Sequence, residues 1–222
     1  MAKKKPEARK QMSSFEWRSY LKKVSRDLLK DVAIREALPD DVISSGWMGY
    51  DGATESQIAA LEKRLRRPLP PSYRSFLTES NGWRNCGCFI DKLWPCSKVA
   101  WFRKRNQEWI EAYVEPWEDS GKPDVSDEEY FVYGDKQNSC KIRVEYLQTA
   151  LEVSDCGDSA IVLLNPKVIT EDGEWEAWLF ANWLPGATRY RSFRELMQAE
   201  HKTFLRLQKE NPSKSQYGNA GQ

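Results

Sequence analysis

The chain has 222 residues and a formal net charge of +1, because 34 Lys and Arg residues nearly balance 33 Asp and Glu residues. This length suits one domain with extensions, and the balanced charge argues against general affinity for nucleic acid. No apolar stretch approaches the roughly 20 residues of a membrane span, and the N-terminus lacks the apolar stretch of a secretory signal, so we expect a cytoplasmic protein with no membrane partner.

The N-terminal region is basic, with ten Lys or Arg residues against three acidic ones over residues 1–30. Residues 1–12 are predicted to be a disordered arm. Ser13 and Glu16 have the spacing of a capping box, which predicts a helical extension over residues 13–44 that packs on the domain behind it. The arm could contact phosphates nonspecifically, but a solubilising arm is the simpler interpretation, so nucleic acid is not expected as a partner.

An amphipathic helix is predicted to follow Thr54. The spacing of Thr54 and Gln57 is that of a capping box, in which each residue satisfies a backbone N–H of the other. Its apolar stripe is formed by Ile58, Leu61 and Leu65. One face of this helix is therefore expected in the core.

A second helix is predicted directly after the first. The pair Pro70-Pro71 suits a first helical turn, because a missing N–H there has no intrahelical partner to lose. The expected buried face consists of Tyr73, Phe76 and Leu77. Asn81-Gly82 then offers a left-handed stop.

These two helices and their flanks resemble the signature of the SUKH superfamily, the Smi/Knr type of cell-wall-regulator domain. That signature has a Trp and a Gly, an acidic residue that opens a helix, Leu-Pro-x-x-Tyr-x-x-Phe-Leu and Asn-Gly. The matching residues are Trp47, Gly49, Gly52, Glu55, Ile58, Leu61, Glu62, Leu69, Pro70, Tyr73, Phe76, Leu77, Asn81 and Gly82. Gly157-Asp158 and the run 161–166 resemble the family's later strand and Asn-Pro turn. The expected SUKH-like domain spans residues 45–207, with a flexible tail over 208–222.

The remaining segments predict an α+β fold, in which an antiparallel β-sheet meander packs with helices. The expected helices are 97–115 and a last helix capped by Ser192 and Glu195. The expected strands are 86–93, 130–133, 141–146, 160–164 and 175–180, with a turn at 171–173.

An acidic stretch is the best candidate for a partner-binding surface. Residues 108–135 hold ten acidic residues and one basic residue, with aromatic side chains among them. Acidic charge can steer a basic protein partner, and desolvated aromatic rings can hold it. The candidate residues are Glu108, Trp109, Glu111, Tyr113, Glu115, Trp117 and Asp119, with a second acidic group at Asp155 and Asp158. The alternative is that Trp109 and Tyr113 are core residues of a helix whose other face is only solvated.

Catalytic chemistry has little support in the sequence. His201 is the only His, which excludes mechanisms that need two, and no Gly-x-Ser-x-Gly elbow is present. The five Cys residues contain no C-x-x-C pair, so reduced thiols, several of them buried, are expected rather than a zinc site. We predict no catalytic residue, cofactor or metal site. Buried positions are expected for Cys140 and Cys156.

The resemblance implies a non-catalytic binding protein. Bacterial members are mostly immunity proteins of polymorphic toxin systems, which bind and block a cognate toxin, often a nuclease or a deaminase, and a fungal relative regulates cell-wall synthesis and signalling. The expected function is therefore that of an immunity protein, or antitoxin, that neutralises a cognate toxin. The alternative is a regulatory scaffold that docks signalling or cell-wall-synthesis proteins.

Overall fold

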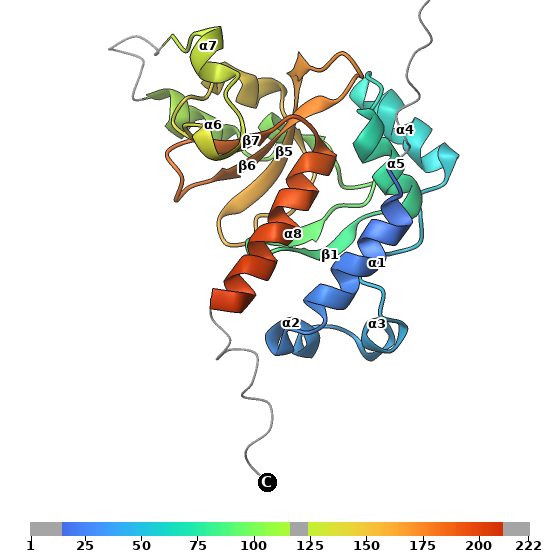
Figure 1. The fold of residues 1–222 in the computed structure, drawn as a ribbon. Coiled ribbons are helices and arrows are strands. Elements are labelled where there is room, and N and C mark those ends of the chain that lie inside the picture. The colour runs from blue at the N-terminus through green and yellow to red at the C-terminus, as the bar shows by residue number, and fades with distance from the viewer. Residues whose placement is uncertain (1–14, 116–123, 211–222) are drawn as a thin grey trace, which may run out of the picture.

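The computed structural model describes residues 15–115 and 124–210 (Figure 1). The helices are α1 (Trp17–Leu28), α2 (Val32–Glu36), α3 (Asp40–Ser45), α4 (Glu55–Leu65), α5 (Pro71–Glu79), α6 (Gln107–Val114), α7 (Asp127–Tyr130) and α8 (Phe193–Glu210), with 3-10 turns η1 (Phe102–Lys104), η3 (Gly134–Lys136) and η4 (Val144–Thr149). The strands are β1 (Trp83–Cys86), β2 (Ile90–Leu93), β3 (Ala100–Trp101), β4 (Leu151–Glu152), β5 (Ala160–Ile169), β6 (Trp175–Ala181) and β7 (Ala187–Tyr190).

The main sheet has five strands in the order β3-β4-β5-β6-β7, and every neighbouring pair is antiparallel. Strands β1 and β2 form a separate antiparallel hairpin. Helices and antiparallel sheets together confirm the predicted α+β class.

Both faces of the main sheet are covered. Val162 and Leu164 of β5 belong to a core cluster shared with α1, α4, α5 and α8. Ile161 and Leu163, which alternate with them, belong to a second cluster shared with α6, α7 and η4. The continuous apolar run in β5 is therefore explained by burial on both sides, and α8 lies across one face of the sheet (Figure 1).

The paired helices α4 and α5 form as predicted. Thr54 accepts a hydrogen bond from Gln57 N, and the Gln57 side chain accepts one from Thr54 N, which completes the capping box. The stop of α5 differs from the prediction, because its C-cap is Ser80 in an extended conformation. Gly82, at φ +104°, instead turns the chain into β1, and a Cβ there would lie 2.9 Å from the carbonyl oxygen of Leu93.

The N-terminal extension is helical, as predicted, and α1 shares the core of the domain. Trp17 and Leu21 are buried in the same cluster as Phe76 of α5 and Phe193 of α8. Helix α1 begins at Trp17 with Glu16 as its N-cap, so it starts later than the predicted capping box would place it; Ser13 lies outside the described residues. Packing of Trp17 in the core holds the start of α1 in place.

Four other predicted elements differ from the structure. Residues 130–133 and 141–146 are not strands, since α7 ends in the first segment and η4 begins in the second. Ile142 and Val144 are buried as their alternation suggested, but within irregular chain. The predicted helix 97–115 is helical only at α6, because Ala100 pairs with Glu152 in the sheet. The predicted strand 86–93 is in fact the turn and second strand of a hairpin.

Candidate protein-binding surface

The turn between β6 and β7, residues 182–186, brings the two groups of predicted binding residues together. On one side, the hydroxyl of Tyr113 in α6 donates a hydrogen bond of 3.2 Å to the carbonyl oxygen of Leu184. On the other, the indole N–H of Trp183 donates one of 2.8 Å to the carbonyl oxygen of Asp158. A single turn therefore links α6 to the loop between β4 and β5. We call these residues, together with the exposed carboxylates of α6 and the neighbouring Phe89, the β6–β7 turn surface.

Helix α6 places its aromatic residues inward. Trp109 and Tyr113 are half-buried, and their rings lie 5.0 and 4.8 Å from the ring of Phe180 in β6. Much of each ring is thus used to attach α6 to the sheet. Trp109 and Tyr113 therefore contribute more to the core than to a surface that a partner could contact.

The carboxylates of α6 point away from that core. Glu108, Glu111 and Glu115 recur at i, i+3 and i+7, and all three are exposed. They line an open groove of about 550 Å³ together with Val114. None of the three has an ion-pair partner among the described residues, and Glu111 accepts a hydrogen bond of 2.9 Å from the Gln107 side chain. A basic partner would therefore meet carboxylates that no described cation neutralises.

The loop between β4 and β5 is held rigidly against its neighbours. The carboxylate of Asp155 accepts a hydrogen bond of 2.8 Å from Lys92 N, and Asp155 N donates one of 3.0 Å to Lys92 O. A Cβ on Gly157 would lie 2.3 Å from the carbonyl oxygen of Phe89, so only glycine allows this close approach. Burial raises the pKa of Asp155 from its ordinary value, and the nearby Asp91 acts in the same direction.

Trp183 is a candidate binding residue that sequence reasoning missed. Its side chain is 45% exposed, and its ring lies 5.0 Å from that of Phe89 in the β1–β2 turn. Asn182 N donates to Ser159 O at 3.1 Å and fixes the backbone beside it. An exposed Trp held in one orientation resembles the aromatic anchors that dominate binding energy in protein interfaces. The available signal was a Trp inside a turn, where no strand or helix pattern requires a large apolar side chain.

Two of the predicted binding residues, Trp117 and Asp119, lie outside the described residues. Glu108, Trp109, Glu111, Tyr113 and Glu115 all lie on α6 or at its end, and Asp155 and Asp158 lie across the β6–β7 turn from them. Their role in binding stays a prediction.

The side chain of the single His makes a contact between two helices. His201 of α8 is 7% exposed, and its Nε2 lies 3.1 Å from a carboxylate oxygen of Asp27 in α1. Burial lowers the pKa of His201, and Asp27 opposes that shift. Within the described residues, no three or more His, Cys, Asp and Glu side chains are grouped so as to hold a metal ion.

The thiols are free, but not all lie where they were expected. Cys86 and Cys96 are buried, whereas Cys88, Cys140 and Cys156 are exposed. The expectation of buried positions for Cys140 and Cys156 is wrong, because the first lies in an irregular turn and the second in the loop before β5.

A buried polar network behind α6 was also not predicted. Glu176 of β6 and Arg189 of β7 are both 0% exposed and form an ion pair of 3.6 Å. Tyr130 and Tyr133 donate hydrogen bonds of 2.6 and 2.8 Å to the Glu176 carboxylate. Burial raises the pKa of both phenols, and Glu176 acts in the same direction. Two further donors to Glu176 are Asn165 and Trp178. Every polar partner is within the protein, so this network positions the chain around α7 rather than forming an open site.

Comparisons with known proteins identify the middle of the chain. Residues 52–198 match the family model described as the SMI1 / KNR4 family (SUKH-1). The match runs from just before α4 into α8, and it includes the β6–β7 turn surface. A comparison with curated proteins finds no match. No helix in the described part of the chain combines the length and the apolar character needed to cross a membrane.

Proposed function

The chain belongs to the SMI1 / KNR4 family (SUKH-1), and from that membership we propose that it is a non-catalytic binding protein, an immunity protein that neutralises a cognate protein toxin in the cytoplasm. The family match covers well over half of the chain, and the family includes toxin immunity proteins. Inhibition of this kind needs a stable complex and no turnover.

The exposed Trp183 is the observation that carries this proposal beyond family membership. Its side chain is 45% exposed, yet its N–H bond to the Asp158 carbonyl oxygen and its tilted contact with the Phe89 ring hold it in place. An anchor that is ordered before binding loses little conformational entropy on association, which increases affinity. The exposed Asp158 accepts the Trp183 N–H with its carbonyl oxygen, and α6, which carries exposed carboxylates, contacts the same turn through Tyr113. A basic partner would therefore be attracted toward this part of the surface.

The mechanism that we propose is steric occlusion. A basic surface of the toxin approaches the acidic residues of the β6–β7 turn surface, and Trp183 enters a pocket or cleft of the toxin. The nuclease or deaminase activity of such a toxin would then be blocked without any chemical change.

Co-expression with the product of the adjacent large gene tests this function. We expect the wild-type chain to rescue growth and to co-purify as a one-to-one complex. Trp183→Ala should weaken that complex by at least tenfold, since an aromatic anchor contributes about 2 kcal/mol or more. The matched control is Ile169→Ala, because Ile169 is 48% exposed at the opposite end of the β5–β6 pair.

The carboxylates give a second, independent test of the same surface. Glu111→Lys with Glu115→Lys should slow association and lose its effect at high salt, since the screening length is about 8 Å at physiological ionic strength. Glu36→Lys with Glu171→Lys is the control, because it changes the charge equally at exposed sites elsewhere. Undiminished protection by folded Trp183 and Glu111/Glu115 variants would contradict the placement of the surface. The absence of both toxicity and a complex would favour the regulatory scaffold instead.

A further inference from the structure

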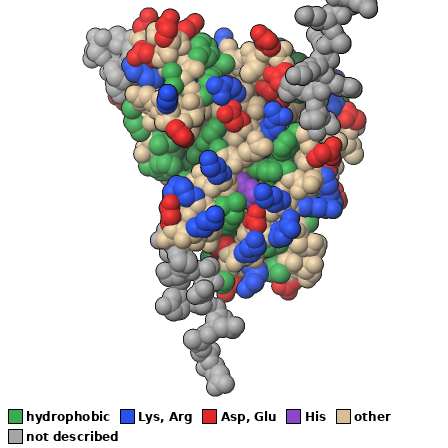
Figure 2. Space-filling model, in the orientation of Figure 1, with side chains coloured by type: hydrophobic (Ala, Val, Ile, Leu, Met, Phe, Trp, Pro, Cys, Tyr) green, Lys and Arg blue, Asp and Glu red, His purple; other side chains and the backbone are tan. Residues whose placement is uncertain are grey.

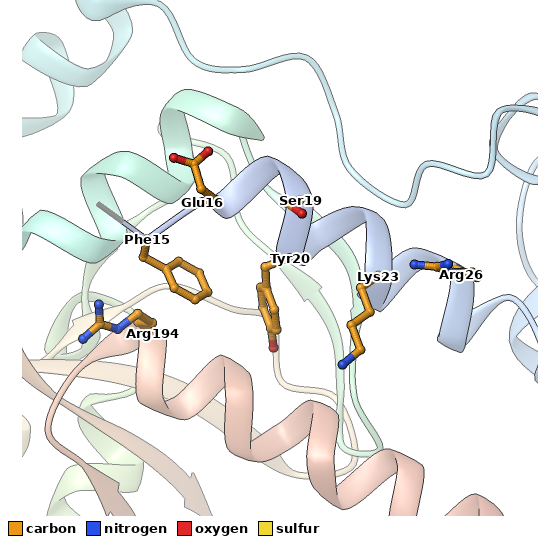
Figure 3. Close-up of a pocket in the computed structure, with 7 residues that line it drawn as sticks. All are labelled: Phe15, Glu16, Ser19, Tyr20, Lys23, Arg26 and Arg194. Carbon is orange, nitrogen blue, oxygen red and sulfur yellow. The ribbon is translucent and has the colours of Figure 1, made fainter. Parts of the chain in front are cut away.

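A small cavity lies where α1, α8 and the β1–β2 hairpin meet, and it takes no part in the proposed function. His201 lines it, and in Figure 2 only a small part of this single His shows between Lys and Arg side chains. Figure 3 shows Tyr20 and Lys23 extending from α1 toward α8, and the Tyr20 hydroxyl donates to Met197 O at 2.8 Å. The contact between the two helices therefore separates the cavity from solvent.

The size of the cavity limits what it can hold. About 10 Å³ is open to the centre of a water molecule. This is about the least volume that holds one water, and it is too small for any larger ligand. Most of the wall is apolar or weakly polar, with Val24, Leu28, Cys86 and Met197 among its members. A cavity with such a wall binds water only where polar atoms face it.

Two polar atoms without a partner belong to the residues of this wall. Trp83 of β1 and Glu200 of α8 both line the cavity, at 0% and 3% exposure. Neither Trp83 Nε1 nor Glu200 Oε2 has a hydrogen-bond partner among the described residues. Such atoms are rare in folded proteins, because a buried polar group that has lost its bonds to water costs free energy unless another bond replaces them. One small ligand between the two atoms would satisfy both.

The position of the Glu200 carboxyl group directs its free oxygen toward the cavity. Its other oxygen, Oε1, accepts a long hydrogen bond of 3.5 Å from the Tyr190 hydroxyl of β7. A Cβ on Gly87 would lie 3.4 Å from Oε2, and Gly87 lines the same cavity. Oε2 therefore lies beside the wall that the β1–β2 turn contributes.

Water matches these two atoms in chemistry as well as in size. The indole N–H of Trp83 only donates, so its partner must accept, and a metal cation is excluded as that partner. The Glu200 oxygen accepts when the carboxyl is ionised, and a protonated carboxyl can also donate. Water can accept from the indole and bond to the carboxyl in either state. We propose that this cavity binds one water molecule, which accepts a hydrogen bond from Trp83 Nε1–H and bonds to Glu200 Oε2.

The bound water would join α8 to the hairpin by a polar link. Strand β1 is bonded through its backbone to β2 and to Gly49. Helix α8 meets β1 through side chains, such as Met197, whose sulfur lies 3.3 Å from that of Cys86. The water adds a directional contact to this apolar packing, and it does not depend on any partner of the protein.

A crystal structure of the full chain, at a resolution that shows ordered water, tests the site without any substitution. We expect one water within hydrogen-bond distance of both Trp83 Nε1 and Glu200 Oε2. The same water should remain in Glu200→Gln, because the amide still bonds to water, and it should be lost in Glu200→Leu. A wild-type structure with no ordered water in the cavity, or with Trp83 Nε1 bonded directly to a protein acceptor, would overturn the proposal.

A double-variant cycle tests the bridge in solution. Urea unfolding at pH 5 keeps charge out of the comparison, because burial raises the pKa of Glu200 to about 7 and its carboxyl is then protonated in the folded state. Trp83→Phe and Glu200→Leu each remove one partner of the water. Their combined effect on the unfolding equilibrium constant should therefore be smaller than the product of the single effects, by about threefold or more. With Glu200→Gln in place of Glu200→Leu, the effects should multiply.

The matched control replaces Trp83→Phe with Trp178→Phe. Trp178 is equally buried, but its N–H donates to Glu176 at 2.6 Å, in the cluster on the other face of the sheet. Its effect should multiply with that of Glu200→Leu. Simple multiplication in the cycle of Trp83→Phe with Glu200→Leu as well would contradict the shared water, since two residues that bond to one water do not act independently.

Discussion

The two sides of the five-stranded sheet are stabilised by different interactions. On the side of α1, α5 and α8, aromatic rings provide the contacts: Trp17 packs against Phe76 at 5.5 Å, and Phe76 packs against Phe193 at 5.0 Å between ring centroids. On the side of α6 and α7, rings such as Trp109 and Tyr113 also pack on Phe180, but this side additionally contains the buried ion pair of Glu176 and Arg189.

Backbone regularity explains this difference. Helices satisfy their own N–H and C=O groups, so α1, α5 and α8 can present apolar stripes to the sheet. The chain after α7 is irregular, and its carbonyl groups need donors. Arg189 supplies them, since its guanidinium donates to the carbonyl oxygens of Tyr130 and Val132. On this side of the sheet, the buried charge of Arg189 therefore satisfies backbone carbonyl groups that a regular helix would satisfy internally.

Removal of one member of the buried ion pair should cause the largest loss of stability. Arg189→Met should lower the free energy of unfolding by about 3–5 kcal/mol, because it leaves the Glu176 carboxylate buried without its cation. Urea unfolding measures the loss. The double variant Glu176→Leu, Arg189→Met removes both charges and should be less destabilised than Arg189→Met alone. If the double variant were the worse of the two, the tyrosine and carbonyl partners would be the main source of stability.

On the side of α1, α5 and α8, the loss of buried apolar volume alone should lower the free energy of unfolding. Leu21 of α1 is fully buried, so Leu21→Ala should cost about 3–4 kcal/mol by removing buried surface and leaving a cavity. The same urea experiment measures it, with Lys22→Ala on the exposed face of α1 as the control. A cost below about 0.5 kcal/mol would show that α1 does not share the domain core.

The buried carboxyl group of Glu200 in α8 makes the stability of the protein depend on pH. Burial raises the pKa of Glu200 to about 7, while a hydrogen bond from Tyr190 opposes the shift. The folded state therefore holds the proton more tightly than the unfolded state, and this stabilisation is lost as pH rises from about 4.5 to 7. Glu200→Gln should match the wild type near pH 4 and exceed its unfolding free energy by up to about 3 kcal/mol at pH 8.

Unfolding in urea at a series of pH values measures that difference. Glu210→Gln, at an exposed position in the same helix, should show no comparable trend. A difference between Glu200→Gln and wild type that is constant from pH 4 to pH 8 would mean that Glu200 titrates alike in both states.

The two sides also differ in how far the sequence predicts them. Helices α4 and α5 are encoded by neighbouring residues, such as Thr54 with Gln57, and the apolar spacing of α8 is equally local. Strand β7 was missed because Arg189 looks like a surface residue until its partner is known. Glu176 and Arg189 are 13 positions apart, on two strands of the sheet, and no local pattern marks either as buried.

The candidate surface was predictable in composition but not in arrangement. The acidic residues of α6 and the pair Asp155 and Asp158 were both visible in the sequence. Their connection depends on two contacts with the same turn. Tyr113 contacts Leu184, 71 residues further along the chain, and Asp158 contacts Trp183, 25 residues further along. Trp183 carries no periodic signal, so only the fold shows that it is exposed in the turn that contacts both α6 and Asp158.

The smallest predicted effect concerns the N-terminal cap of α4. Thr54→Ala removes the acceptor for Gln57 N at the start of α4 and should lower the free energy of unfolding by about 1 kcal/mol. Thr78 is the matched control: it is exposed in α5, and its hydroxyl donates back to the Arg74 carbonyl, a contact that favours the helix little. Thr78→Ala should therefore be neutral or stabilising by a few tenths of a kcal/mol. Equal losses at both positions would mean that side-chain packing, and not the cap, is what Thr54 contributes.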